Sequence, residues 1–102
     1  MSAPKQIVFD GYTCTVARLA YQNGRVALRL MDAYGGAPVT TATVNLIDEP
    51  MDADEVAIKT YSENDGMLAA LIEAGIVSAP VRHVRSGWVE VPVCKLLMEV
   101  ER

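Results

Sequence analysis

The chain is poor in the residues on which metal sites, disulfide frameworks and most catalytic centres depend. Its 102 residues include one histidine, two cysteines, one tryptophan and one phenylalanine. Structural zinc needs four clustered ligands, and a lone histidine with two widely separated cysteines cannot supply them. Cys14 and Cys94 form no Cys-x-x-Cys motif, which predicts buried, reduced thiols in a cytoplasmic protein.

Membrane-spanning and phosphate-binding segments are also missing. No run reaches the roughly 18 consecutive apolar residues of a membrane span, and the opening Met-Ser-Ala-Pro-Lys has no apolar run typical of a secretory signal. Gly35-Gly36 lacks the lysine of a phosphate loop. Counted from Asp48, the acidic segment lacks the glycine at the sixth position and the glutamate at the twelfth position of a calcium loop. We therefore expect no enzymatic activity, no metal and no cofactor.

Hydrophobic residues, by contrast, are plentiful. They make up 51% of the chain, and charged residues make up 22%. This composition argues against disorder, and the length suits one domain, residues 1–102, with one sizeable core.

The strongest local signal is a β-hairpin. Segments 13–22 and 25–31 flank Asn23-Gly24, a pair that tolerates the two positive φ angles of a type I′ turn. A two-residue loop places Arg18 directly opposite Arg29 on the outer face. The core-facing pairs that follow from this register are Tyr21–Val26, Leu19–Leu28 and Ala17–Leu30.

Further strands are expected on both sides of this hairpin. Residues 7–9 form a short strand that Asp10-Gly11 interrupts, and the β-branched segment 39–46 follows a Gly-Gly turn. Residues 56–61 form another short strand. Segments 81–85 and 88–94 form a final pair, in which Pro92 indicates an edge strand or a bulge.

One helix is expected to begin at Ser62. Ser62 and Asp65 approximate a capping box, and Gly75 suits a left-handed cap at the other end. The apolar stripe of this helix comprises Met67, Leu68, Leu71 and Ile72. The predicted class is therefore α+β, a mostly antiparallel sheet of about five or six strands with one helix packed on a face.

Acidic residues are concentrated in one segment. The net charge is −4, yet residues 48–65 alone carry −6, since seven acids face only Lys59 there. Such a patch attracts basic partners and repels nucleic acid, and it predicts a contact surface; a solvated loop that keeps the protein soluble is the alternative. The candidate contact residues are Asp48, Glu49, Asp52, Asp54, Glu55, Glu63 and Asp65.

Two other features invite a binding role. The facing pair Arg18 and Arg29, with Arg25 nearby, needs a negative group, either an internal carboxylate or the phosphate of a nucleotide-like ligand. Trp88 beside Arg85 is either part of the core or, if exposed, the anchor of an interface such as a homodimer formed at the strand edge near Pro92.

Several phrases of the chain together carry a resemblance. They are Ala27–Leu30, Thr41–Leu46, Asp54–Lys59, Val89–Leu96 and, most specifically, Tyr61–Met67. The chain resembles an uncharacterised family of small proteins carried by bacteriophages, plasmids and conjugative elements. The resemblance implies an anti-defence role of the anti-CRISPR kind. We therefore expect a non-enzymatic protein in the host bacterial cytoplasm that inhibits a defence protein or ribonucleoprotein with a basic groove, without binding nucleic acid or membranes directly.

Overall fold

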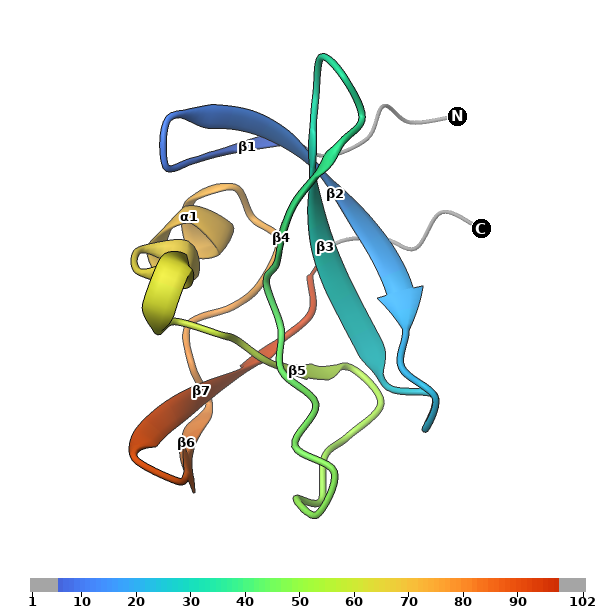
Figure 1. Ribbon diagram of the computed structural model, residues 1–102. Helices are drawn as coiled ribbons and strands as arrows, with labels where there is room; N and C mark the ends of the chain where they lie inside the picture. The colour runs from blue at the N-terminus through green and yellow to red at the C-terminus, as the bar shows by residue number, and fades with distance from the viewer. Residues whose placement is uncertain (1–5, 98–102) are drawn as a thin grey trace.

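The computed structural model describes residues 6–97 and arranges them in two antiparallel sheets and one α-helix (Figure 1). The strands are β1 (Gln6–Phe9), β2 (Tyr12–Ala20), β3 (Val26–Asp32), β4 (Pro38–Thr41), β5 (Glu55–Ala57), β6 (Arg82–Ser86) and β7 (Val89–Lys95), and the helix is α1 (Met67–Glu73). The larger sheet has the order β1-β2-β3-β4, and the smaller has the order β5-β7-β6. The α+β class is confirmed.

The expectation of a single sheet of five or six strands is wrong. The chain leaves the larger sheet after Thr41, earlier than the predicted strand 39–46 ends, and runs on toward the smaller sheet. There Thr43 makes one isolated bridge to Ile58. A single bridge links the two sheets without merging their ladders, so the four strands and the three strands remain separate.

Asp10-Gly11 closes the first hairpin instead of interrupting a strand. Phe9 pairs with Tyr12, and the two loop residues have φ angles of 53° and 81°. Two positive φ angles in a two-residue loop are the geometry of a type I′ turn. The tight turn predicted for Asn23-Gly24 is therefore found here.

The β2–β3 loop is one residue longer than predicted, which shifts the register. The Tyr21 amide donates to Arg25 O (2.8 Å) and Gly24 alone is left-handed, with φ of 87°, as in a type I turn followed by a glycine bulge. Arg18 consequently pairs with Leu28 and Ala17 with Arg29. Because neighbouring positions point to opposite faces, the two arginines do not face each other, and that prediction is wrong.

The same shift exchanges the core residues of β2. Val16 pairs with Leu30 and is buried, whereas Leu19, a predicted core residue, is 44% exposed. Leu28 and Leu30 of β3 are fully buried as expected, because the error lies in the partner strand only.

Helix α1 begins later and without the predicted cap. Ser62 instead opens a 3-10 turn, and Gly66, with φ of 89°, precedes α1 with no side-chain cap. The end matches the prediction: Gly75 has φ of 75°, and the Ile76 amide donates to Leu71 O (3.0 Å), as in a Schellman motif.

Strand β7 lies in the centre of its sheet, so the expected edge position of Pro92 is wrong. Pro92 O accepts from the Ile58 amide (2.9 Å), just beyond the last residue of the short strand β5. Because the N and C=O of one residue face the same side, the proline N faces Ile58 and not β6, so the β6–β7 ladder does not need the missing N–H. β6 is the edge strand on the other side of β7.

Two apolar clusters fill the molecule. The main one joins the larger sheet to α1 and to Val56 and Cys94 of the smaller sheet. The second lies around Val91 and Val93, which therefore do not cover the helix. Within residues 6–97, no helix has the length and apolar character needed to cross a membrane.

Candidate functional site

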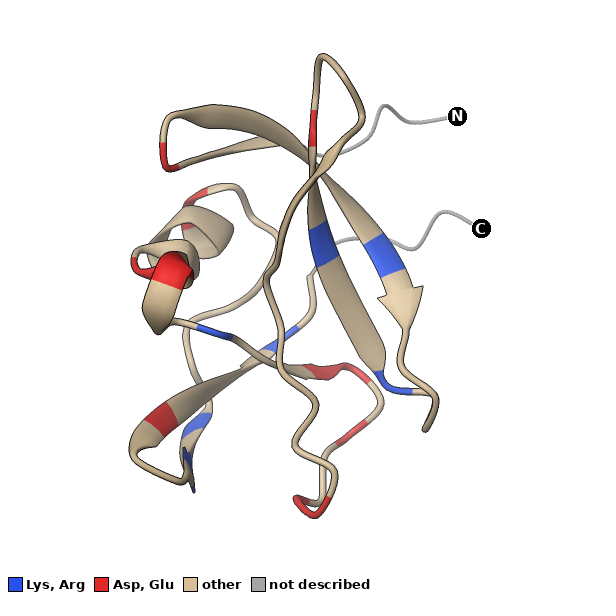
Figure 2. Cartoon of the chain, viewed as in Figure 1, with Lys and Arg blue, Asp and Glu red and all other residues tan. Residues whose placement is uncertain are grey.

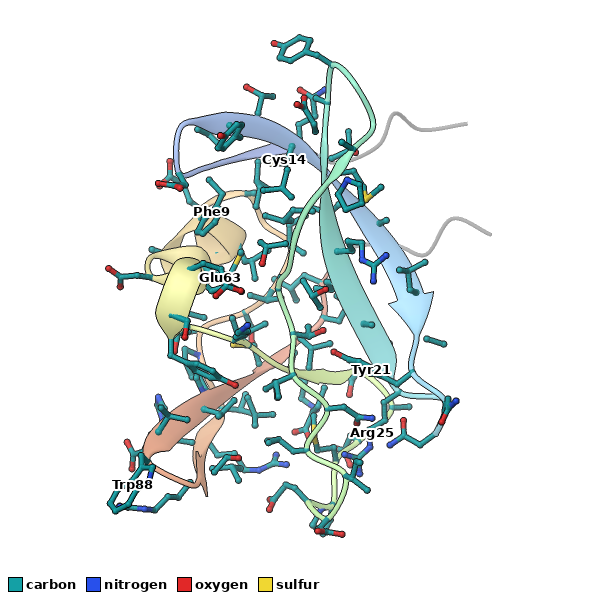
Figure 3. The ribbon with its side chains drawn as sticks, viewed as in Figure 1. Phe9, Cys14, Tyr21, Arg25, Glu63 and Trp88 are labelled. Atoms are coloured by element: carbon teal, nitrogen blue, oxygen red, sulfur yellow. The ribbon has the colours of Figure 1, made fainter. Side chains whose placement is uncertain are left out.

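The candidate site is the acidic loop, residues 46–54, which is held to the body by arginine. Arg25, in the turn after β2, donates from Nη1 to Leu46 O and from Nη2 to Glu49 O (2.6 Å) (Figure 3). Its Nη1 also lies 3.7 Å from Met51 Sδ. The guanidinium of Arg25 is thus used inside the molecule and does not join a three-arginine anion site.

Arg82 of β6 holds the other side of the acidic loop. Its Nη2 donates to Pro50 O (2.8 Å), its Nη1 to Glu55 Oε2 (2.8 Å), and its Nε lies 3.8 Å from Glu49 Oε2. Glu55 is buried, and its Oε1 accepts from the Asp52 amide (3.0 Å). The hydrogen bond from Arg82, with that amide, lowers the pKa of Glu55. Glu55 therefore stabilises the loop and does not contribute to an exposed surface.

Lys95 of β7 forms ion pairs with two exposed carboxylates of the acidic loop. Its Nζ lies 3.3 Å from Asp54 and 3.5 Å from Asp52, whose side chains are 59% and 75% exposed. The hydrogen bond with Asp54 raises the pKa of Lys95. Asp48 is exposed and makes no ion pair within the described residues. Five carboxylates at 48–55 against three cations leave a local formal charge of −2.

The seven predicted acidic residues do not form one surface. Acidic residues gather in the acidic loop and, separately, around α1 (Figure 2). Glu63 lies beside α1, away from Arg25 (Figure 3), and forms an ion pair with Lys59 (2.9 Å). That pair lowers the pKa of Glu63 and raises the pKa of Lys59. Asp65 is exposed near the start of α1.

Asn64 is a buried polar residue that sequence reasoning did not single out as a site. Its Oδ1 accepts from Thr40 Oγ1 (2.9 Å) and its Nδ2 donates to Thr41 O (2.8 Å). It thereby fixes the 3-10 turn to β4. Only its place in the distinctive Tyr61–Met67 stretch marked it in the sequence.

The structure separates the arginines of the predicted anion site and exposes the tryptophan of the predicted interface. Arg18 is half-buried on one face of the larger sheet, while Arg29 is exposed on the other. Arg85 and Trp88 lie on the β6–β7 hairpin, and Trp88, at its tip, is 95% exposed (Figure 3). Trp88 is therefore not part of the core.

The two cysteines, one pocket and the possible metal ligands are the remaining candidates for chemistry. Cys14 and Cys94 are buried and unbridged, and burial raises the pKa of Cys94 to about 11. A pocket of about 350 Å³ beside β1 and β4 carries Asp32 and Glu63, but Asp32 already accepts from the Tyr34 amide and Glu63 pairs with a lysine. Within residues 6–97, no three histidine, cysteine, aspartate or glutamate side chains gather as metal ligands.

The described geometry offers surfaces for contact: a loop held at fixed positions and an exposed hairpin tip. Comparisons of the chain with protein-family models, curated proteins and solved structures found no match. A function for the chain is therefore proposed from its own residues, their arrangement and the resemblance noted in its sequence.

Proposed function

We propose that the chain is a non-enzymatic protein of a mobile element that binds a bacterial defence complex in the host cytoplasm and blocks a basic groove on it with the acidic loop. The observation that carries this proposal is the exposure of Asp52 and Asp54 on a loop held in place by buried and half-buried partners. The resemblance to mobile-element proteins selects the class of partner.

Rigid presentation is what makes this loop suitable for binding. Arg25 and Arg82 bond its main-chain oxygens, so contacts within the chain fix the path of the loop backbone. A preorganised loop loses less conformational entropy on binding than a free one. Its residual negative charge accelerates the encounter with a basic groove and makes the association weaken as salt is added.

The residues to test are Asp48, Asp52 and Asp54. Glu55 is excluded because its replacement would disturb the loop itself. The test is affinity capture from host lysate with mass spectrometry, at low and high salt, using a variant with all three aspartates changed to asparagine. The matched control carries Asp10→Asn, Glu73→Gln and Glu90→Gln, which removes the same charge at exposed positions outside the loop.

The proposal expects a defined partner that is captured by the native chain and the control, released by salt and lost in the loop variant. If both triple variants lose capture to the same extent relative to the native chain, total charge, and not the loop, drives association. Capture of the same partner by the loop variant at both salt concentrations would refute the proposal.

The nucleotide-binding alternative lacks its geometric basis. It rests on Arg18 and Arg29 facing one phosphate with Arg25 nearby, but Arg18 and Arg29 lie on opposite faces and Arg25 is bonded to the acidic loop. We therefore do not favour a phosphorylated ligand at these residues.

A further inference from the structure

Strand β6 is the open edge of the smaller sheet. Because Pro92 O faces β5, its cross-strand partner His83 belongs to a non-hydrogen-bonded pair and directs its N–H and C=O away from β7. Alternation along the ladder gives Arg85 the same direction. Both residues are exposed, and neither makes a backbone hydrogen bond outside the hairpin in the described part of the chain. The edge therefore offers two outward donors and two outward acceptors.

The side chains along this edge are basic. Three of the five residues of β6 are Arg82, His83 and Arg85. Arg82 is bonded to the acidic loop, whereas Arg85 forms no ion pair among residues 6–97, not even with Glu90 across the hairpin. A free cation beside unpaired backbone groups favours a negatively charged strand.

A second copy of this chain is a poor occupant of the edge. An antiparallel twofold pairing of β6 with itself places His83 opposite Arg85 when it is centred on Val84. A shift of two residues places Arg85, or His83, opposite its own copy. Arg85 opposite its own copy is a pair of like charges, which is destabilising on paired strands, and charged edges are a known protection against self-association. The homodimer considered from the sequence is therefore disfavoured at this edge.

Trp88 extends the same edge with an apolar anchor. It follows Gly87, whose φ of 61° suits the first position of a two-residue type II′ turn, and it stands at the hairpin tip. A tryptophan that is 95% exposed leaves most of its ring available to a partner. Aromatic residues of this kind commonly contribute a large part of binding energy.

We propose that β6 accepts an extended acidic segment of a partner protein as a fourth strand of the smaller sheet. Backbone bonds to His83 and Arg85 hold the segment, its carboxylates lie beside those side chains, and an apolar residue covers Trp88. Such strand addition combines main-chain affinity with side-chain selection. The inference goes beyond the acidic loop and is independent of it.

The sole tryptophan makes the proposal directly measurable. The full chain is titrated with a synthetic capped peptide of alternating valine and glutamate, and the emission of Trp88 is followed. The comparison peptide replaces glutamate with lysine. We expect a saturable blue shift with the acidic peptide and none with the basic one. A shift that appears on concentrating the protein alone would identify a second copy as the occupant and overturn the proposal.

Two variants separate the edge from general electrostatics. Arg85→Glu reverses the free cation, and His83→Pro removes an outward N–H without removing a bond of the β6–β7 ladder. Arg29→Glu, on the exposed face of the larger sheet, is the matched charge control. We expect each edge variant to weaken binding at least about tenfold and the control to retain it, with circular dichroism showing that all remain folded.

The test also distinguishes this inference from the proposed function. The triple asparagine variant of the acidic loop should bind the acidic peptide as well as the native chain does. Absence of an emission change up to millimolar acidic peptide, or equal losses in Arg85→Glu and Arg29→Glu, would refute strand addition at β6 and leave the role of the acidic loop unaffected.

Discussion

Replacing Asn64 should reveal how strongly one buried amide joins the 3-10 turn to β4. Asn64 is fully buried, accepts from Thr40 Oγ1 at 2.9 Å and donates to Thr41 O at 2.8 Å. Asn64→Ala leaves that hydroxyl and that carbonyl without partners. A buried polar group left unpaired costs about 1–3 kcal/mol, and because Thr40 and Thr41 are half-buried and can be partly rehydrated we expect a loss of about 1–2 kcal/mol. For a domain of this size the midpoint of thermal unfolding should fall by roughly 10 °C.

Asn64→Asp adds a dependence on pH with a defined sign. The new carboxylate can still accept from Thr40 but faces Thr41 O without a proton. Burial and this carbonyl raise the folded-state pKa of the carboxyl above its unfolded value of about 4. A group whose pKa is raised on folding contributes most stability below the unfolded pKa and loses it as pH rises through the folded one. The gap to the native chain should therefore be widest near about pH 7 and narrow toward about pH 4.

Urea unfolding followed by circular dichroism measures both effects. Asp65→Asn, one residue away and exposed, is the control, and we expect it to stay within about 0.5 kcal/mol of the native chain. A double-mutant cycle with Thr40→Val isolates the side-chain hydrogen bond. The reasoning fails if Asn64→Ala is as stable as the control, or if the deficit of Asn64→Asp stays constant between neutral and acidic pH.

Three further outcomes follow from the described contacts. The hydrogen bond from Arg82 lowers the folded pKa of Glu55, so the contribution of Glu55 to the free energy of unfolding is present above the unfolded pKa of about 4.3 and is lost on acidification. Glu55→Gln should therefore be less stable at neutral pH and show a shallower acid dependence in urea unfolding from about pH 7 to about pH 3. Because burial raises the pKa of Cys94 and of Cys14, a thiol-specific reagent at about pH 8 should label neither in the native chain and both after unfolding. Gly75→Ala should cost about 1 kcal/mol in thermal unfolding, since alanine is strained at the φ of 75° found there.

Local signals in the sequence identified most elements but not always their register. Asn23-Gly24 fits both a two-residue turn and a three-residue loop with a glycine bulge, and the two differ by one residue. That single residue separates Arg18 from Arg29 and exchanges Val16 for Leu19 in the core. Choosing between the two loops depends on which face of β2 meets the rest of the core, which neighbouring residues do not determine.

The pairing of distant segments was the other feature that could not be predicted from the sequence. The acidic character of residues 48–55 was visible in the sequence, but the cations that hold them come from positions up to 43 residues away. Pro92 was taken as the sign of an edge because nothing local shows that its main-chain N and C=O face the end of the short strand β5 and not the β6–β7 ladder. The exposure of Trp88 follows from its place in a two-residue turn, whereas the sequence alone allowed a strand start.

The way in which Arg25 and Arg82 hold the acidic loop also bears on how the loop can change over generations. Both arginines bond main-chain oxygens, at Leu46, Glu49 and Pro50, which substitution of the side chains leaves in place. The outward side chains can then be exchanged while the backbone path is preserved, as in a variable loop on an antibody framework. A randomised library at the exposed positions of the loop should accordingly yield a high fraction of folded members.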